Sequence, residues 1–267
     1  MTEIIQKKLA KLNINPSKDL GQNFLIDPSV VSSIIDFAKP KKDENLLELG
    51  PGLGALTAEL SEISKLTVIE IEENFCKNLQ KEFPNINILN EDVRFVDFSE
   101  IGNDLVVFGN LPYSFSSDIT FQLIEYAPFI KRAVIMLQKE FAERLAGVPN
   151  TKKYGTISIL TQLKATARLG PVFSGDCFYP SAKVESQMVE LTFYHPPKYE
   201  IKNDLRLKEI ISATFQQRRK KITNTLTRIT GLSLPELREK LVTLNIDPNK
   251  RPENLTIEEF LIMSENL

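Results

Sequence analysis

The four residues Asn110-Leu111-Pro112-Tyr113 are the stretch of the chain whose residue types most directly suggest chemistry. They follow the apolar run 105–108 and Gly109, a pattern that predicts a buried strand ending in a close backbone turn. Pro112 fixes its own φ and keeps Leu111 extended, so the loop should be stiff. A stiff loop that offers a side-chain amide, free carbonyls and an aromatic face suits a flat ring with an amino group, such as adenine or cytosine.

A glycine-rich loop occupies residues 48–55, with the sequence ELGPGLGA. Gly50, Gly52 and Ala55 fit the dinucleotide-binding fingerprint, and Glu70 lies 20 residues after Gly50. An oxidoreductase that uses a nicotinamide dinucleotide is therefore one interpretation of this loop.

The charge around the glycine loop favours a different ligand. Glu48 precedes Gly50 by two residues and would oppose a pyrophosphate at the loop. S-adenosylmethionine has no phosphate, and its sulfonium and α-ammonium groups are both cationic. Glu70 could accept from its ribose hydroxyls, and Glu91-Asp92 could accept from its adenine amino group. We therefore expect S-adenosylmethionine rather than a nicotinamide dinucleotide.

These residues together suggest methyl transfer to an amino-bearing base. An adenine N6 is a poor nucleophile because its lone pair is delocalised into the ring. The Asn110 side-chain oxygen and the carbonyl of Leu111 or Pro112 could accept from both N–H groups and aim the lone pair at the methyl, in line with its sulfur. Tyr113 would stack on the base, and its face could contribute roughly 0.5–2 kcal/mol as positive charge develops. The scheme requires neither a metal nor a general base, because the cationic product amine can lose its proton to water.

The elements that must position these residues alternate between strand and helix. A helix is predicted from Asp27-Pro28 through Phe37, with Asp as N-cap and Pro in the first turn. Further helices are expected near Gly54, near Glu72, after 116, near 138 and at 155–165. Strands are expected at about 45–49, 66–71, 86–89, 104–109, 132–137 and 187–194. This alternation predicts an α/β fold with a doubly wound, mainly parallel sheet, whose ligands bind at the carboxyl ends of the strands.

The C-terminal part is expected to be a separate helical domain. Residues 195–198 (HPPK) have the composition of a linker, and two capping boxes, at 233–236 and 256–259, predict helix starts beyond it. We therefore expect a catalytic domain over 1–198, with an N-terminal extension over 1–27, and a small all-helical domain over 199–267.

Composition limits the class of protein. The 267 residues are 42% hydrophobic and 25% charged, which is ordinary for a globular protein. No apolar run approaches the roughly 20 residues of a membrane span, and the first residues lack a signal-peptide core. Cys76 and Cys177 have no metal-ligand spacing, and His195 is the single histidine. We expect free thiols, no metal, no membrane and a cytoplasmic location.

Charge is distributed unevenly along the chain, although the net charge is only −2. Residues 41–104 carry 14 acidic and 6 basic side chains, whereas residues 200–230 carry 8 basic and 3 acidic ones. The first region would tolerate a cationic ligand and the second could contact phosphate. Two solvated surfaces of unequal charge would give the same pattern.

The sequence resembles the rRNA adenine N6,N6-dimethyltransferases, and among them the branch that modifies the small ribosomal subunit. The resemblance covers nearly the whole chain and rests on several specific segments. These are 21–25 (GQNFL), 48–54 (ELGPGLG), 68–70 (VIE), 109–113 (GNLPY), 137–140 (LQKE), 154–155 (YG), 215–220 (FQQRRK) with Asn224, and 251–255 (RPENL).

The resemblance implies a Rossmann-like methyltransferase fold and assigns residues to the cofactor and the base. The residues implied to contact S-adenosylmethionine are Asn23, Leu25, Gly50, Glu70, Asp92 and Asn110. The segment Asn110 to Tyr113 is implied to hold the target adenine. A second aromatic, in a Phe-x-Pro-x-Pro-Lys-Val segment, closes on the other face of the base in the family. Here that segment is 178–184 (FYPSAKV), so Phe178 is its counterpart, and Ala182 replaces the second proline.

The resemblance further implies a pair of adjacent adenosines in the last hairpin loop of small-subunit (16S) rRNA as the substrate, each methylated twice. A loop base is already partly unstacked, so its extrusion costs only a few kcal/mol. Basic side chains that could contact the RNA are Lys183, Arg218, Arg219, Lys220 and Lys221.

Two alternatives stay open beside this interpretation. Relatives that methylate large-subunit rRNA and confer macrolide resistance typically have Ile where this chain has Leu111, and tend to be strongly basic, whereas this chain has a pI near 5.7. The chain could also act chiefly as a ribosome-assembly binding factor. No pattern indicates an oligomer, so we expect a monomer.

Overall fold

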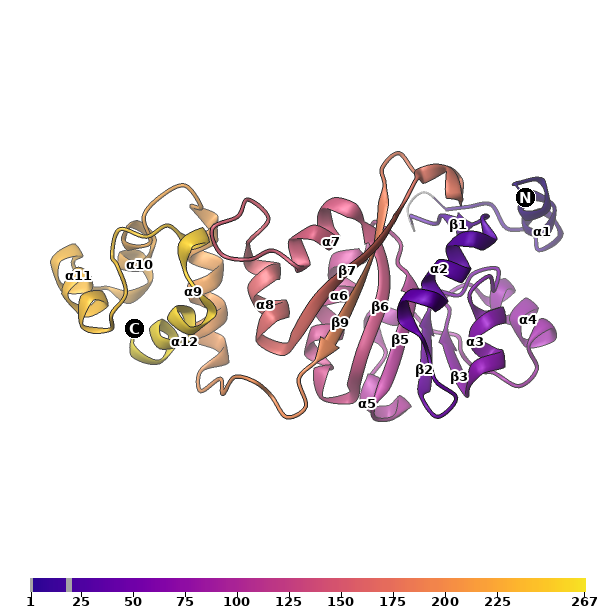
Figure 1. Ribbon diagram of the computed structural model, residues 1–267, viewed down its shortest axis with the longest axis horizontal. Coiled ribbons are helices and arrows are strands. Elements are labelled where there is room, and N and C mark those ends of the chain that lie inside the picture. Colours follow the sequence, from indigo (N-terminus) through magenta and orange to yellow (C-terminus); the bar gives the residue numbers. More distant parts are fainter. Residues whose placement is uncertain (1, 18–20) are drawn as a thin grey trace. The chain divides into compact units, whose positions relative to one another are not determined.

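A computed structural model describes residues 2–17 and 21–267 of the chain (Figure 1). These residues form two compact units, one of Met1–Ala142 with Ala165–His195, the other of Glu143–Lys164 with Pro196–Leu267. Within residues 2–17 and 21–267, no helix is long and apolar enough to cross a membrane. Cys76 and Cys177 are free thiols, as expected. No group of three or more His, Cys, Asp or Glu in the described ranges could hold a metal ion.

A seven-stranded sheet forms the centre of the first unit, in the order β4-β3-β2-β5-β6-β9-β7. The first five strands in this order are parallel, whereas β9 pairs antiparallel with both β6 and β7. The strands are β2 (Asn45–Leu49), β3 (Leu66–Ile69), β4 (Asn87–Leu89), β5 (Leu105–Asn110), β6 (Ile130–Gln138), β7 (Ala165–Phe173) and β9 (Ser186–Phe193). The predicted mainly parallel α/β sheet is confirmed.

One strand of this sheet, β7, was not predicted. Its sequence is interrupted by Gly170-Pro171, where the pairing with β9 shifts register between Leu169 and Val172. Because neither residue favours a regular strand, and most of its side chains are partly exposed, β7 lacks the apolar run that marks the inner strands.

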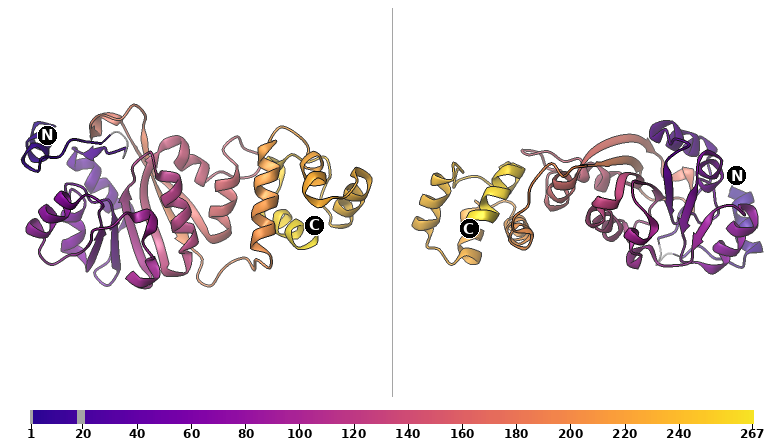
Figure 2. Two further views of the ribbon diagram at one scale, coloured as in Figure 1. Left: turned by 180° about the vertical axis from the view of Figure 1, so that it is seen from behind. Right: turned by 90° about the horizontal axis from the view of Figure 1, so that it is seen from below.

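Helices cover both faces of the sheet, with α2 on one face and α6 on the other (Figures 1 and 2). Asp27 caps α2 as predicted, accepting from the Ser29 backbone N–H at 2.9 Å, and Pro28 is its first residue. Helix α2 covers Pro28–Ala38, and α7 (Lys139–Leu145) follows β6. The other helices of the N-terminal half are α1 (Thr2–Lys11), α3 (Thr57–Ile63), α4 (Glu73–Glu82), α5 (Phe98–Ile101) and α6 (Ser116–Glu125).

A second, two-stranded sheet holds the N-terminal segment in place. β1 (Phe24–Leu25) pairs antiparallel with β8 (Phe178–Tyr179), so that Leu25 lies opposite Phe178. This pairing anchors the segment that carries Asn23 to the first unit.

The second unit is helical, with a core of its own. It contains α8 (Thr156–Lys164), α9 (Asp204–Gln216), α10 (Thr223–Thr230), α11 (Leu234–Thr243) and α12 (Ile257–Asn266). The capping boxes predicted at the starts of α11 and α12 are both present, made by Ser233 with Glu236 and by Thr256 with Glu259.

The predicted domain boundary at 198/199 differs from the division that the structure shows. Residues 143–164 belong to the helical unit, because Tyr154, Ile159 and Leu163 are packed in one core cluster with the helices after residue 200. The periodicity of α8 predicts a helix but does not reveal which core it joins.

Candidate functional site

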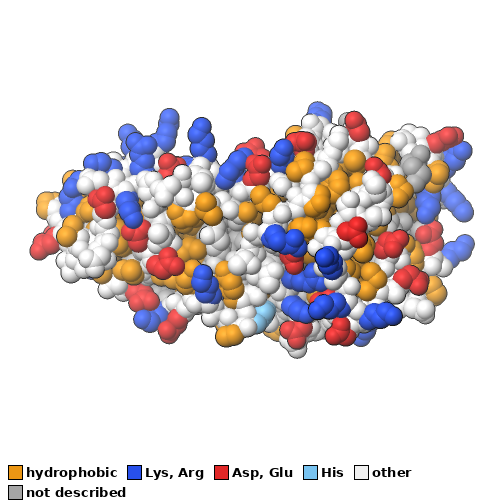
Figure 3. Space-filling view, viewed as in Figure 1, with side chains coloured by type: hydrophobic (Ala, Val, Ile, Leu, Met, Phe, Trp, Pro, Cys, Tyr) orange, Lys and Arg blue, Asp and Glu red, His pale blue; other side chains and the backbone are white. Residues whose placement is uncertain are grey.

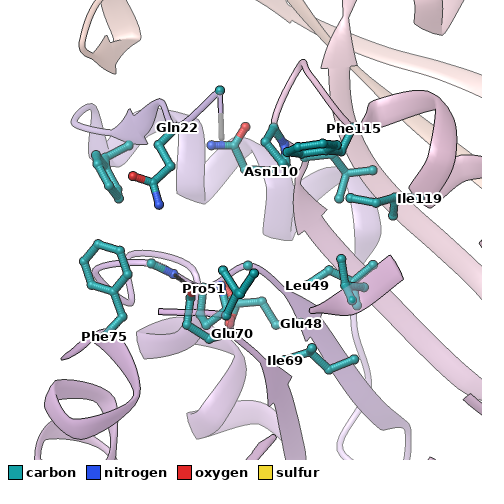
Figure 4. A pocket seen from close by; sticks show the side chains of 18 of the residues that line it. Gln22, Glu48, Leu49, Pro51, Ile69, Glu70, Phe75, Asn110, Phe115 and Ile119 are labelled. Atoms are coloured by element: carbon teal, nitrogen blue, oxygen red, sulfur yellow. Dashed lines mark hydrogen bonds between the residues drawn. The ribbon is translucent and has the colours of Figure 1, made fainter. Parts of the chain in front are cut away.

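A cavity lies at the carboxyl ends of the parallel strands, where the order of the sheet reverses between β2 and β5. It is lined by the loops after β2, β3, β4 and β5 and by the N-terminal segment 21–25. Asn110 and Phe115 lie on one side of this cavity, and Glu48, Pro51 and Glu70 on the opposite side (Figure 4). The residues implied to bind the cofactor therefore converge on one cavity.

The glycine loop has a conformation that requires glycine. Gly50 and Gly52 have φ of +66° and +55°, and a Cβ on Gly50 would meet no atom within 4 Å. The Gly52 N–H donates to Glu70 Oε2 at 3.0 Å, and the Glu72 N–H donates to Glu70 Oε1 at 2.9 Å. Because Glu70 already uses a loop amide, that amide is not offered to a pyrophosphate.

Glu48 is buried beneath the loop, and its side chain is 3% exposed. Thr57 Oγ1 donates to Glu48 Oε2 at 2.7 Å. Burial, which outweighs this hydrogen bond, and the neighbouring Glu70 charge raise the pKa of Glu48 to about 8. Burial also raises the pKa of Glu70, against the opposing effect of its backbone donors. A cation in the cavity would favour the ionised form of both groups.

Asp92 lies in the same cavity, in the turn after β4 and just before the short 3₁₀ helix η1 (Val93–Phe95). Its carboxylate accepts from the Arg94 guanidinium at 2.5 to 3.1 Å and from the Arg94 backbone N–H at 3.0 Å. These bonds, first of all the side-chain one, lower the pKa of Asp92. The expected hydrogen-bond acceptor is thus present, already engaged by a cation that we did not predict.

Asn110 ends β5 with its amide in a defined orientation. Its Nδ2 donates to the carbonyl oxygen of Asn23 at 2.9 Å, as Figure 4 shows. Its Oδ1 is therefore the atom left to accept a hydrogen bond. Asn23 holds Asn110 through its backbone, and its side chain donates to the Gly21 carbonyl at 3.1 Å.

The two carbonyls that follow Asn110 differ in their availability. The Pro112 carbonyl accepts from the Phe115 N–H at 3.1 Å and from Ser116 Oγ at 3.0 Å. No hydrogen bond from any residue of the described ranges to the Leu111 carbonyl is observed. Of the two carbonyl acceptors left open by the sequence, the structure favours that of Leu111.

Tyr113 lines the cavity and is tied to a distant part of the chain. Its hydroxyl lies 2.6 Å from Ser186 Oγ, and Ser186 is fully buried at the start of β9. Burial raises the pKa of Tyr113, and this effect is larger than the opposing effect of the hydrogen bond to Ser186. Ser186 thus fixes the ring that was predicted to stack on the base.

The prediction for Phe178 differs from the structure. The side chain is 2% exposed and packs in the hydrophobic core with Leu25, Val30 and Met188, and it does not line the cavity. The cause is the pairing of β8 with β1, which places Phe178 opposite Leu25. In this structure the second aromatic residue at the cavity on the side of Asn110 is Phe115.

The basic residues of the predicted RNA interface separate into two kinds. Arg218 donates through Nε to Glu253 at 2.8 Å and through a guanidinium N–H to the Thr151 carbonyl at 3.0 Å, so it joins segments of the helical unit. The predicted contact with RNA phosphate would therefore come from a guanidinium that already has partners within the helical unit. Lys221 donates to Asn249 at 2.8 Å.

Arg219 and Lys220 are both exposed. Within residues 2–17 and 21–267 neither forms an ion pair. In Figure 3, several Lys and Arg side chains gather at the upper left edge, over the region of α9 and α10. Lys183 is likewise exposed, in the loop between β8 and β9 of the first unit.

Four residues that shape the site were missed from the sequence: Thr57, Arg94, Phe115 and Ser186. Ser186 and Thr57 carry no local signal, because each acts on a residue that only the fold brings near. Arg94 could have been noticed as the single cation among the acids between Glu82 and Asp104.

Comparisons with known proteins match nearly the whole chain. A family profile described as "Ribosomal RNA adenine dimethylase" matches residues 13–267. The "Ribosomal RNA small subunit methyltransferase A" of Clostridioides difficile is 34% identical over 272 residues, covering 98% of this chain and 93% of that protein.

Two solved structures share the fold across the length of the chain. A dimethyladenosine transferase from Plasmodium falciparum has a TM-score of 0.77 at 25% identity, covering 90% of this chain and 95% of its own. The 23S rRNA methyltransferase ErmE has a TM-score of 0.70 at 25% identity, covering 92% of this chain and 99% of its own. Since the profile, the relative and the fold all extend over nearly the whole chain, the chain belongs to the ribosomal RNA adenine dimethylase family.

Proposed function

We propose that this chain transfers methyl groups from S-adenosylmethionine to N6 of two adjacent adenosines in the 3′-terminal hairpin loop of small-subunit rRNA. Each adenosine would become N6,N6-dimethyladenosine, and the modification would accompany small-subunit biogenesis. The similarity to small-subunit methyltransferase A over 98% of the chain supports the substrate class. We further propose that the enzyme acts as a cytoplasmic monomer without a metal.

Open space at the glycine loop and acidic side chains in the cavity support S-adenosylmethionine as its ligand. Gly50 leaves open space at the loop, and the carboxyl groups of Glu48, Glu70 and Asp92 line the cavity. The carboxylate of Glu70 accepts from the backbone N–H groups of Gly52 and Glu72, and it can accept further from ribose hydroxyls. When bound, the sulfonium supplies an electrophilic methyl group.

The observation that carries the proposal is the orientation of Asn110. Because Nδ2 donates to the Asn23 carbonyl, Oδ1 is left to accept from the substrate. The neighbouring Leu111 carbonyl receives no hydrogen bond from the residues that the structure describes. Two acceptors at the end of one strand match the two N–H groups of an adenine N6. They would turn its lone pair toward the methyl group and hold the two reacting atoms near contact distance, where proximity supplies much of the catalysis.

Tyr113 would stack on the extruded base. Its ring is fixed by Ser186, so the stacking surface is already in place before the base enters. Phe178 packs behind β1, and we propose that it supports the segment of Asn23 rather than meeting the base.

The test is transfer of labelled methyl from S-adenosylmethionine to small and large ribosomal subunits that lack the modification, followed by primer extension. We expect incorporation into small subunits and a block at two neighbouring adenosines near the 3′ end. Because ErmE shares the fold at a TM-score of 0.70, large subunits are the necessary comparison. Incorporation into large subunits only would refute the proposal.

A role chiefly in subunit assembly is separable by one variant. Asn110→Ala removes the Oδ1 acceptor, so methylation should fall by at least about 100-fold, since an unpaired N6–H and a misaimed lone pair both raise the barrier. Binding to small subunits should persist. If cells with this variant mature subunits normally, methylation is dispensable for assembly; if Asn110→Ala methylates normally, the catalytic assignment is wrong.

A further inference from the structure

Arg94 joins two residues of the cavity wall that lie on different elements. Its guanidinium binds the carboxylate of Asp92, with Nη2 to Oδ2 at 2.5 Å and Nε to Oδ1 at 3.0 Å. The same guanidinium lies over the ring of Phe115, 4.0 Å from its centroid. Asp92 lies in the turn after β4, whereas Phe115 immediately precedes α6, and all three residues line the cavity.

The bonds from Arg94 leave Asp92 one acceptor direction. A carboxylate has about four lone-pair sites. Three N–H donors of Arg94 reach this carboxylate: the backbone N–H to Oδ1 at 3.0 Å, Nε shared between Oδ1 at 3.0 Å and Oδ2 at 3.1 Å, and Nη2 to Oδ2 at 2.5 Å. Three donors against about four acceptor sites leave capacity for one further donor in the cavity. A carboxylate held in this way can distinguish a ligand that offers one N–H donor from a ligand that lacks it.

We propose that Arg94 is a positioning residue that makes the cavity selective for a methyl donor whose purine carries a 6-amino group. This inference rests on the proposed function, because it assumes that the adenosyl part of the donor meets Asp92. Arg94 acts through its neighbours: it aims the free acceptor of Asp92 and fixes the ring of Phe115.

The charges around Asp92 agree with this role. Arg94 is the cation that faces it, and Asp118 of α6 acts in turn on the Arg94 guanidinium. The other ionisable groups that line the cavity are Glu48, Glu70, Glu91 and the phenol of Tyr113. None of these is a cation, so without Arg94 the pKa of Asp92, now held below its ordinary value, would rise.

The experiment measures affinity for two non-reactive ligands by calorimetry: S-adenosylhomocysteine and its 6-deamino analogue, which carries hydrogen in place of the amino group. The wild type should prefer the amino compound by about tenfold or more, the range expected for a hydrogen bond to a charged acceptor. Arg94→Met keeps an unbranched stem and removes the guanidinium fork, and should reduce the preference to about threefold or less at pH 7.5.

The pH profile and the kinetics distinguish a role of Arg94 in positioning Asp92 from a nonspecific structural effect of the substitution. The preference of Arg94→Met should fall further as pH drops from 7.5 to 5, because its Asp92 protonates at higher pH, whereas that of the wild type stays level. Arg94→Lys, which keeps the charge without the fork, should show an intermediate preference and a nearly level profile. In methylation assays, KM for S-adenosylmethionine should rise in Arg94→Met while kcat at saturation stays within about twofold.

A matched control is Arg168→Met. Arg168 also stacks 4.0 Å over a phenylalanine, Phe37, and pairs with a carboxylate, Glu190, but lies outside the cavity. It should leave the preference unchanged. If Arg94→Met keeps the wild-type preference and pH profile, or binds S-adenosylhomocysteine more tightly, the inference fails. If the wild type binds neither ligand, the proposed function itself fails.

Discussion

Glu48 combines an acidic side chain with complete burial, and this changes how the site should respond to pH. Its pKa is raised to about 8, mainly by burial, so the carboxyl is largely protonated at neutral pH when no ligand is bound. A cationic ligand favours the ionised form and lowers this pKa. Binding then releases a proton below about pH 8, and the affinity should increase as the pH rises toward that value.

We therefore expect the affinity for S-adenosylmethionine to rise severalfold between pH 6 and 8 and then to level. Glu48→Gln should remove most of this slope. S-adenosylhomocysteine, which lacks the sulfonium charge, serves as the control ligand and should show a shallower slope in the wild type. Calorimetry in two buffers of different ionisation enthalpy measures the released proton directly. An equal slope in Glu48→Gln and wild type would assign the proton to another group.

The hydrogen bond between Tyr113 and Ser186 gives a second prediction at the residue scale. Removing it from either side, by Tyr113→Phe or Ser186→Ala, frees the ring and should lower kcat about two- to tenfold, as for a net hydrogen bond of about 0.5–1.5 kcal/mol. Affinity for S-adenosylhomocysteine should be unchanged.

A double-mutant cycle provides the control for this prediction. Because both variants remove the same bond, Tyr113→Phe with Ser186→Ala should be no slower than the worse single variant. Additive losses would show that the two residues act separately.

At the scale of elements, Arg218 has a structural role that its neighbours Arg219 and Lys220 do not share. Arg218 joins the turn after α9 to Thr151 and Glu253. Arg218→Ala should therefore destabilise the protein by about 1 kcal/mol, since the pair with Glu253 is partly exposed. Thermal unfolding should begin a few degrees lower.

The double variant Arg219→Ala with Lys220→Ala tests the exposed pair. It should leave thermal unfolding unchanged within about a degree, because neither side chain forms an ion pair in the described ranges. Small-subunit binding should weaken, and the slope of log K against log salt should fall by roughly 0.7 per lost phosphate contact. If Arg218→Ala instead flattens the salt slope without lowering the unfolding temperature, the structural role of Arg218 is wrong.

At the scale of the whole molecule, the cavity and the exposed pair Arg219 and Lys220 belong to different compact units. The residues of the cavity lie in the unit of Met1–Ala142 and Ala165–His195, whereas Arg219 and Lys220 lie in the helical one. Each unit has its own hydrophobic core, made by separate clusters of buried residues.

This division predicts local protection on ligand binding. At 100 times its Kd, S-adenosylhomocysteine should stabilise the unit that binds it by about 2.7 kcal/mol. Hydrogen exchange should slow in the first unit, most at residues 48–56, 70–76 and 105–113, and stay unchanged in α9 to α12. Equal protection of both units would show that they unfold together.

Much of this arrangement follows from local patterns in the sequence. Apolar runs predicted the inner strands to within one or two residues, and Asp27-Pro28 and the two capping boxes predicted their helix starts, because caps and buried strands depend on neighbours in the chain. β7 escaped prediction because Gly170-Pro171 interrupts it. The burial of Phe178 and the membership of α8 in the helical unit depend on pairing and packing with distant segments.

The sequence by itself determined the family, the α/β architecture and the residues Asn110 to Tyr113, since these depend on motifs and on periodicity. Only the tertiary structure decided which atoms of those residues are free to act. The Asn23 carbonyl leaves Asn110 Oδ1 as the acceptor, and the bonds to the Pro112 carbonyl leave that of Leu111. The reason is physical, because a hydrogen-bond partner is set by proximity in space. Asn23 and Asn110 are 87 positions apart in the chain, Tyr113 and Ser186 are 73 positions apart, and only the fold brings each pair together.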